Sequence, residues 1–242
     1  MSLDERSQMA IYRLMNHGVI AKLQNPVKQG KESLVLHALA PDGRELAVKV
    51  HTSKVFREHE RKQYLFGDWR YRHAKRHITL RTEAINSEKE FRNLSRLEKA
   101  RVPAPRPVSF YENIVVMSFI GENGEAASSL NTTENVDYEV MAKKILRATR
   151  DLVLQAQLVH GDLSPYNILV WKEDPYMIDL SQAVLITHPD ATRLLRRDME
   201  KVEAFFSAQG INTEPFHKLF TRIVRAGRTG PHDHPDSTRL SE

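Results

Sequence analysis

The stretch LVHGDLSPYNILV (residues 158–170), followed by MIDLSQ (residues 177–182), combines apolar runs with three polar side chains, Asp162, Asn167 and Asp179. The apolar runs are typical of buried strands. A buried charge without a partner costs several kcal/mol, so such strands normally exclude carboxylates. The pattern therefore predicts a cationic group or a metal ion next to these three side chains.

The three side chains have the spacing of a phosphoryl-transfer site. Asn167 follows Asp162 in a D-x-x-x-x-N pattern, as in a kinase catalytic loop, and Asp179 lies 17 residues after Asp162, where the kinase metal aspartate belongs. Phosphoryl transfer needs Mg²⁺ between phosphate oxygens, oxygen ligands for that metal, and a carboxylate near the acceptor. We therefore assign Asn167 and Asp179 as metal ligands, and Asp162 as the residue that takes or orients the acceptor proton. The expected ligands are ATP and Mg²⁺, with Mn²⁺ as the alternative metal.

A strand lysine completes the predicted catalytic set of Lys49, Asp162 and Asp179. In the strand ELAVKV, Lys49 should face away from its apolar neighbours and contact the α/β-phosphates of ATP. Glu90 in the helix SEKEFRNL is its predicted ion-pair partner, and Glu88 is the fallback. A competing interpretation is a helix capping box, because Ser87 precedes Glu90 by three residues.

Composition excludes several classes of protein. The 242 residues suit one large domain or a two-lobed one. No apolar run reaches the length of a membrane span and the N-terminus is polar, so we expect a cytoplasmic protein without a membrane partner. The absence of cysteine excludes disulfides and thiolate metal sites. The histidines show no metal-ligand spacing, and His160 is predicted to be a buried hydrogen-bonding residue rather than a base.

The positive charge is concentrated in residues 54–81. This segment holds nine Lys or Arg against three Asp or Glu, an excess of +6, so the rest of the chain carries about −1 of the total +5. Its aromatic residues interleave with arginines, as on RNA-contacting surfaces where phosphate neutralisation and base stacking cooperate. The alternative is that the aromatics attach the segment to the rest of its lobe. These aromatics are Phe56, Tyr64, Phe66, Trp69 and Tyr71.

Periodicity and turn signals predict an α+β chain with two halves. The expected strands are residues 19–23, 33–40, 45–50, 114–119, 168–171 and 176–178. The expected helices are residues 3–15, 86–100, 136–157, 191–206 and 214–225. The proline-rich RVPAPRPVSF should be extended, and residues 121–131 should form a hinge. We expect an N-terminal lobe at 1–120 with a flexible basic insertion at 53–83, a C-terminal lobe at 121–226, and a disordered tail at 227–242.

The order of these motifs resembles the RIO family of atypical serine kinases, closest to its type-one branch as found in archaea. The matching pieces extend over most of residues 28–210: QGKESLVLHAL, LAVKV, EKEFRNLSRL with VPAPRPV, VVMSFIGENG, LVHGDLSPYNILV, IDLSQAV and THPDATRLLRRDMEKVEAFF. The resemblance implies a two-lobed protein-kinase-like fold with an antiparallel N-lobe sheet, a helix and a helical C-lobe. It also implies that an activation loop and a peptide-binding platform are absent.

Departures from ordinary protein kinases fit this resemblance. Gly30-Lys31-Glu32-Ser33 stands in place of a G-x-G-x-x-G loop, so phosphate contacts should come from Lys31, Ser33 and nearby amides. The arginine of H-R-D is replaced by Gly161, and no A-P-E segment follows Asp179. The remaining residues expected to bind ATP are Val35, Glu90, Met117, Ser118 and Ile120.

The resemblance further implies a role in maturation of the small ribosomal subunit, with binding of ribosomal RNA through residues 54–81. ATP hydrolysis and autophosphorylation are implied as well. Asp179 is a candidate acceptor, as are Ser53, Thr79 and Thr82. Two alternatives stay open: a small-molecule phosphotransferase similar to aminoglycoside or choline kinases, and an ATP-bound docking module with little turnover. Ser181-Gln182 argues against the first, because those enzymes usually have an aromatic residue after the metal aspartate.

Overall fold

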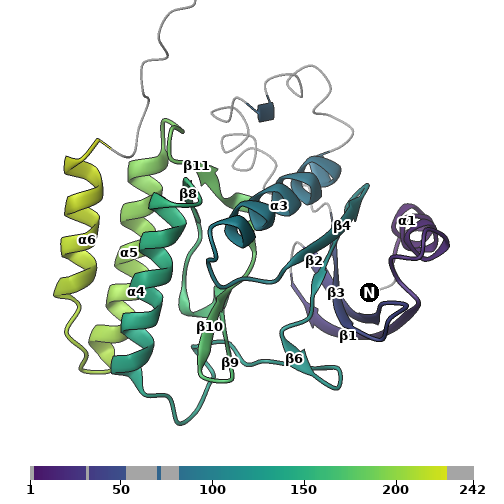
Figure 1. Cartoon of the computed structure of the whole chain (residues 1–242), viewed down its shortest axis with the longest axis horizontal. Helices are drawn as coiled ribbons and strands as arrows, with labels where there is room; N and C mark the ends of the chain where they lie inside the picture. Colours follow the sequence, from purple (N-terminus) through teal and green to yellow (C-terminus); the bar gives the residue numbers. More distant parts are fainter. Residues whose placement is uncertain (1–2, 31–32, 53–69, 72–81, 228–242) are drawn as a thin grey trace, which may run out of the picture.

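The computed structural model describes residues 3–30, 33–52, 70–71 and 82–227 of the chain. The predictions on Lys31, on the tail from residue 228 and on the basic segment other than residues 70–71 lie outside this part. Figure 1 shows a sheet-containing half at the N-terminal side and a mainly helical half at the C-terminal side. In the described part no helix is long and apolar enough to cross a membrane.

The N-terminal lobe contains a five-stranded antiparallel sheet in the order β1-β2-β3-β5-β4. Its central strands follow the predicted apolar patterns closely, and Lys49 of β3 pairs with Val35 of β2 and Val115 of β5. The strands are β1 (Lys22–Gln29), β2 (Ser33–Leu39), β3 (Glu45–His51), β4 (Pro107–Tyr111) and β5 (Ile114–Ser118).

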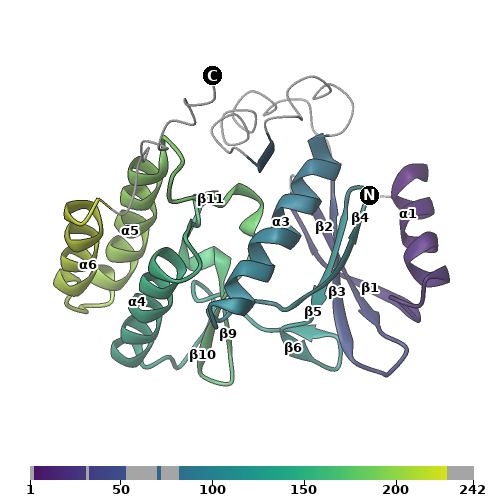
Figure 2. The same ribbon diagram turned by 45° about the horizontal axis from the view of Figure 1, so that its top comes forward.

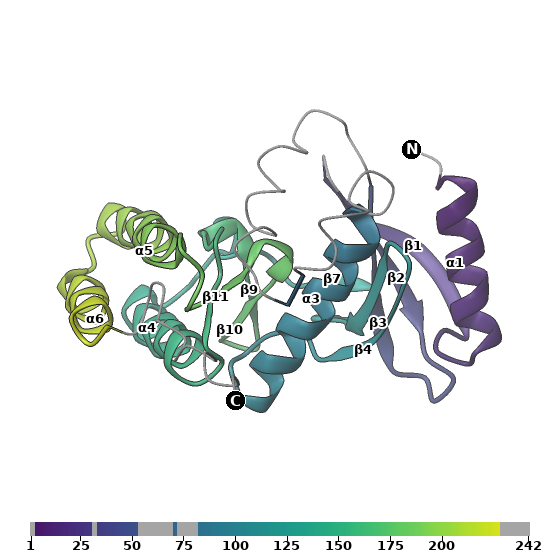
Figure 3. The same ribbon diagram turned by 90° about the horizontal axis from the view of Figure 1, so that it is seen from above.

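Two helices cover opposite faces of this sheet, as Figure 3 shows: α1 (Glu5–Asn16) on one side and α3 (Thr82–Lys99) on the other. Strand side chains alternate between the faces. Val48 and Val50 join the core under α1, so Lys49 between them points to the α3 side, as predicted. On the α3 side one continuous apolar core runs from β5 through α3 into the C-terminal lobe, which ties the two lobes together.

The C-terminal lobe packs its helices on the side away from the N-lobe sheet (Figure 2). Its helices are α4 (Tyr138–Leu154), α5 (Ala191–Ala208) and α6 (Glu214–Arg225), with the 3₁₀ turns η3 (Pro165–Asn167) and η4 (Leu180–Gln182). Its short paired strands are β6 (Gly121–Glu122) with β7 (Glu125–Ala126), β8 (Leu158–Val159) with β11 (Val184–Leu185), and β9 (Ile168–Trp171) with β10 (Asp174–Met177). The predicted lobe boundary at residues 120 and 121 stays a prediction.

Several predicted element bounds are wrong. The strand expected at 19–23 runs instead from Lys22 to Gln29, because β1 is an edge strand whose polar, half-exposed residues lack apolar alternation. The second half of RVPAPRPVSF is extended as expected, but it also pairs as edge strand β4, where prolines are tolerated. The helix expected from residue 86 begins at Thr82, and the hinge contains the β6–β7 hairpin. The helix expected at 136–157 is shorter, since Asp137 caps its start by accepting from the Val140 amide.

Candidate active site

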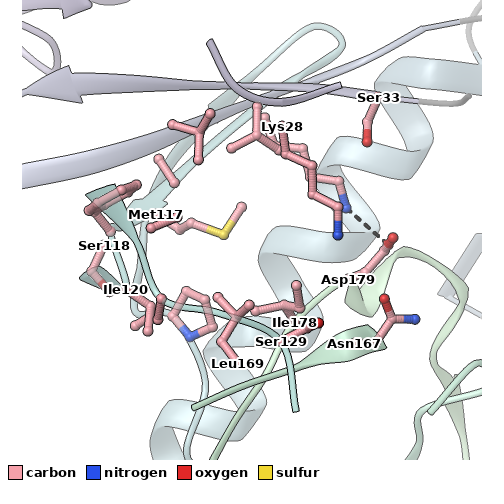
Figure 4. Close-up of a pocket in the computed structure, with 18 of the residues that line it drawn as sticks. Lys28, Ser33, Met117, Ser118, Ile120, Ser129, Asn167, Leu169, Ile178 and Asp179 are labelled. Atoms are coloured by element: carbon pink, nitrogen blue, oxygen red, sulfur yellow. Dashed lines mark hydrogen bonds and ion pairs between the residues drawn. The ribbon is translucent and has the colours of Figure 1, made fainter. Parts of the chain in front are cut away.

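A cavity of about 450 Å³ lies between the N-lobe sheet and the C-terminal lobe (Figure 4). Apolar side chains from β2, β5, the hinge and β9 form one end, among them Val35, Met117, Ile120 and Leu169. Charged and amide side chains gather at the other end. The predicted site residues that line the cavity are Ser33, Val35, Lys49, Glu90, Met117, Ser118, Ile120, Asn167 and Asp179.

Lys49 holds two carboxylates at the polar end of the cavity. Its Nζ lies 2.7 Å from Glu90 Oε1 and 2.9 Å from Asp179 Oδ1. The second Glu90 oxygen lies 2.9 Å from Nε2 of His51, a residue that the sequence interpretation missed. Lys49 is 6% exposed and Glu90 is 1% exposed. Groups from β3, α3 and the N-cap of η4 thus converge on one ion cluster, in which Lys49 and Glu90 are buried and the Asp179 side chain is 43% exposed.

Glu90, rather than Glu88, is the partner of Lys49 in the structure. Glu88 pairs with Arg92 at 2.6 Å on the helix surface. The capping-box interpretation is wrong because α3 begins at Thr82, which puts Ser87 inside the helix. The Ser87 hydroxyl donates to carbonyl oxygens instead.

The charges of this cluster support one another. Burial favours the neutral form of each group, but mutual attraction outweighs it. The pKa of Lys49 is therefore raised by Asp179 and Glu90 against the effect of burial. The pKa of Glu90 is lowered by Lys49 and His51, and the pKa of Asp179 is lowered by Lys49, again against burial. All three groups are ionised at neutral pH.

Asn167 and Asp179 present oxygen atoms on the same side of the cavity. Asn167 Nδ2 donates to the Asp162 carbonyl at 2.9 Å, which leaves its amide oxygen directed toward Asp179 in Figure 4. Ser181 Oγ donates to Asp179 Oδ1 at 2.8 Å. Asp179 adopts a left-handed backbone (φ 64°, ψ 64°), a conformation that aspartate tolerates better than most residues.

These two side chains fit a hard, oxygen-binding metal. Mg²⁺ is typically held by one or two carboxylates together with substrate phosphates and water. Within the described residues no group of three or more His, Cys, Asp or Glu could hold a metal by itself. An ion at Asn167 and Asp179 would therefore need phosphate oxygens to complete its coordination. Lys28 of β1 also reaches into the cavity, a cation that the sequence interpretation did not single out (Figure 4).

Asp162 lies next to the cavity rather than in its lining. Its Oδ1 accepts from Lys201 Nζ at 2.7 Å, and its Oδ2 lies 3.4 Å from Asn167 Nδ2. The side chain is 39% exposed. The carboxylate is thus within reach of a group that approaches from solvent.

Buried hydrogen bonds shape the loop that carries Asp162. Asp198 of α5 is 1% exposed and accepts from the amides of Gly161 (2.8 Å) and Leu163 (3.0 Å). Burial raises the pKa of Asp198 to about 7, although both amide bonds act against this rise. His160 is buried, its Nε2 lies 3.0 Å from the Ile178 carbonyl, and burial lowers the pKa of its ring, as expected for a structural histidine.

Gly161 occupies a position where a larger residue would be strained. Its φ is +80°, and a Cβ there would lie 2.9 Å from the Gln182 carbonyl oxygen. Both facts explain why the arginine of the H-R-D motif is absent. The polypeptide after Asp179 passes through η4 and β11 and enters α5 at Ala191, which leaves no room for an activation loop.

Asn93 and Asp198 are structural determinants of the site that the sequence interpretation missed. Asn93 of α3 is fully buried and donates to the carbonyls of Leu180 (2.9 Å) and Ala183 (3.2 Å), so it holds the turn after Asp179. A signal for Asp198 was present, because it falls on the buried helix face defined by Leu194, Leu195, Met199 and Val202.

Comparisons with known proteins agree with this geometry. The family model described as RIO1, RIO domain, matches residues 34–219. The serine/threonine-protein kinase rio1 of Dictyostelium discoideum is 35% identical over 92% of this chain and 39% of its own length. Human RIO1 is 30% identical over 97% of this chain and 42% of its own length. The RIO-type kinase Rio1 of Haloferax volcanii is 34% identical over 87% of this chain and 72% of its own length.

A solved structure also has the same fold. The Rio2 kinase–ADP/Mg²⁺–phosphoaspartate complex of Chaetomium thermophilum superposes with a TM-score of 0.60 at 19% identity, covering 92% of this chain and 71% of that one. The chain spans about two fifths of the length of the first two relatives named above. The RIO domain model covers more than three quarters of the residues of this chain, and the Lys49–Glu90–Asp179 cluster lies within the matched region. This chain therefore belongs to the RIO family.

Proposed function

We propose that this chain is an ATP- and Mg²⁺-dependent serine/threonine protein kinase that also hydrolyses ATP. The observation that carries the proposal is the convergence of Lys49, Glu90, Asp179 and Asn167 at one end of a cavity whose other end is apolar. The apolar end suits an adenine ring, with Met117, Ser118 and Ile120 at the hinge. The polar end suits a triphosphate.

Each charged residue then has a definite task. Lys49, oriented by Glu90, binds the α/β-phosphates. Asn167 and Asp179 would hold Mg²⁺, which would supply positive charge to the phosphate oxygens. Asp162 takes the proton of the acceptor hydroxyl while the hydroxyl oxygen bonds to the γ-phosphorus. The bond to the β-phosphate oxygen breaks and ADP leaves. With water in place of the hydroxyl, the same steps hydrolyse ATP.

The test is ADP release and label transfer from γ-labelled ATP by the purified chain. We expect turnover that requires Mg²⁺ and falls at least about 100-fold in Asp162→Asn and Asp179→Asn. Turnover in these variants at the wild-type rate would refute the proposal. Stimulation by aminoglycosides or choline alone would favour a small-molecule phosphotransferase. ATP binding without measurable turnover in any condition would favour a docking module.

Autophosphorylation is part of the proposal, with Asp179 as one acceptor. Attack of an Asp179 oxygen on the γ-phosphorus, with ADP as leaving group, would yield an acyl phosphate. The solved Rio2 structure from Chaetomium thermophilum is a complex with ADP, Mg²⁺ and phosphoaspartate. Label on Asp179 should be released by hydroxylamine, whereas label on Ser53, Thr79 or Thr82 should resist it. Absence of hydroxylamine-sensitive label during turnover would refute the aspartyl acceptor.

We further propose that the chain acts in maturation of the small ribosomal subunit, and that residues 54–81 contact ribosomal RNA. A basic pocket of about 410 Å³ supports the RNA contact. Arg70 of residues 54–81 lines this pocket together with Arg92, Arg96 and Lys99 of α3. RNA affinity should fall steeply with salt, since each neutralised phosphate releases counterions. Equal affinity after neutralising Arg70, Arg72 and Arg76 would refute this contact. A cytoplasmic location stays a prediction.

A further inference from the structure

Helix α5 presents three polar side chains to the loop that carries Asp162. Arg197 donates to the Gly161 carbonyl and Asp198 accepts from the Gly161 amide. Lys201 reaches the loop side chain itself, with Nζ 2.7 Å from Asp162 Oδ1. Positions 197, 198 and 201 lie on one side of the helix, because residues three and four apart are neighbours on its surface. The helix therefore contacts both the backbone of the loop and its carboxylate.

The Asp162 carboxylate has a donor near each of its oxygens. Lys201 binds Oδ1, while the Asn167 amide nitrogen lies 3.4 Å from Oδ2 and 2.9 Å from the Asp162 carbonyl. The two donors come from different elements, α5 and η3. Contacts from two elements therefore restrict the rotation of the Asp162 carboxylate.

Stability does not account for the Lys201–Asp162 pair. The side chains are 37% and 39% exposed, and pairs this exposed contribute little to folding. Lys201 is also not among the residues that line the cavity. Its ammonium instead lies against the carboxylate that we assign to the acceptor proton.

We propose that Lys201 is a positioning residue for phosphoryl transfer: it orients the Asp162 carboxylate toward the acceptor and offsets its charge next to the triphosphate. The inference rests on the role proposed above for Asp162. Two carboxylates, Asp162 and Asp179, otherwise lie near a polyanionic substrate, and like charges at such a site repel. The Lys49 ammonium offsets the charge of Asp179, and the Lys201 ammonium offsets the charge of Asp162.

The primary test compares Lys201→Met with Lys201→Arg in the full chain. The structure offers a matched control, Lys144→Met, because Lys144 of α4 pairs with Asp174 at 2.8 Å and is 35% exposed, away from the cavity. We expect the single-turnover rate constant of Lys201→Met to fall about 10- to 100-fold. ATP affinity and melting temperature should match those of the control. Lys201→Arg should recover most of the lost rate, because it keeps the charge and the donor.

A double-variant cycle tests whether Lys201 acts through Asp162. In an Asp162→Asn background, Lys201→Met should cause no further loss of residual rate, since residues that work as a unit are not additive. A wild-type rate for Lys201→Met, or an equal further loss in the Asp162→Asn background, would overturn the inference. If Asp162→Asn itself keeps the wild-type rate, the role proposed for Asp162 fails. If Asp162→Asn is inactive while Lys201→Met is fully active, only the present inference fails.

Discussion

Replacing Glu90 by glutamine tests the central ion cluster. The change keeps the shape of the side chain but removes its charge from Lys49 and His51, which lie 2.7 and 2.9 Å from the two carboxylate oxygens. Breaking a buried ion pair costs about 3–5 kcal/mol. Glutamine can still accept one hydrogen bond from Lys49, worth about 1 kcal/mol. We therefore expect the free energy of unfolding to fall by about 2–4 kcal/mol.

The same substitution should weaken ATP binding. Without Glu90, the buried Lys49 ammonium has Asp179 as its remaining carboxylate partner among the described residues. The contact between Lys49 and Asp179 should then be tighter. Because Asp179 is an assigned Mg²⁺ ligand, ATP and Mg²⁺ must disrupt this contact before they bind. We expect affinity to fall about 10- to 100-fold, equivalent to about 1.4–2.8 kcal/mol. Calorimetric titration with ATP and Mg²⁺ measures it, and urea denaturation measures the stability.

Glu88→Gln is the matched control, with the same chemical change two residues away. Glu88 is 31% exposed and its partner Arg92 is 52% exposed. Such helix-surface pairs contribute about 0.3–0.5 kcal/mol, so ATP affinity should be unchanged. Wild-type ATP affinity in Glu90→Gln combined with weakened affinity in Glu88→Gln would refute the assignment of Glu90.

Three further substitutions test the supports of the site. Gly161→Ala should cost more than about 2 kcal/mol, a drop of roughly 4–8 °C in melting temperature, because of its positive φ and the 2.9 Å approach of its Cβ to the Gln182 carbonyl; an unchanged melting temperature would contradict this. Burial raises the pKa of Asp198 to about 7, so the folded state keeps a proton that the unfolded state releases, and the free energy of unfolding should fall as pH rises from about 4 to 7 and stay level above. Urea denaturation should therefore show the wild type losing roughly 3 kcal/mol relative to Asp198→Asn between pH 5 and pH 8, and an equal difference at both pH values would count against it. Asn93→Ala removes the donor to two carbonyls beside Asp179, which should cost about 1–3 kcal/mol and raise the Mg²⁺ concentration needed for activity; a wild-type Mg²⁺ titration would exclude that coupling.

Prediction of the fold succeeded where apolar residues were concentrated in the strands. Strands β2, β3 and β5 bury at least one whole face in the apolar cores, so apolar residues dominate their sequences. It failed for β1 and β4, since edge strands bury little and can contain polar residues and proline. The start of α3 was also misplaced, at residue 86 instead of Thr82, because the first turn of the helix lacks the apolar spacing of Phe91, Leu94 and Leu97.

Sequence by itself determined the residues whose spacing along the chain is set by a single loop and hairpin. Only one loop, η3 and the β9–β10 hairpin separate Asp162, Asn167 and Asp179, so their spacing along the chain was enough to predict that they lie close together. The facing direction of Lys49 followed from the two-residue period of a strand. These local rules need no knowledge of the rest of the molecule.

Only the tertiary structure decided which distant groups meet that loop. The choice of Glu90 over Glu88 depends on which face α3 turns to the sheet, and the contacts of Asn93, Asp198 and Lys201 join residues between 35 and 90 positions apart. Periodicity can show that one partner is buried, as for Asp198, but it does not show which distant residue that partner contacts. These contacts exist because the shared apolar core packs α3 and α5 against the site, and packing acts on volumes rather than on sequence spacing.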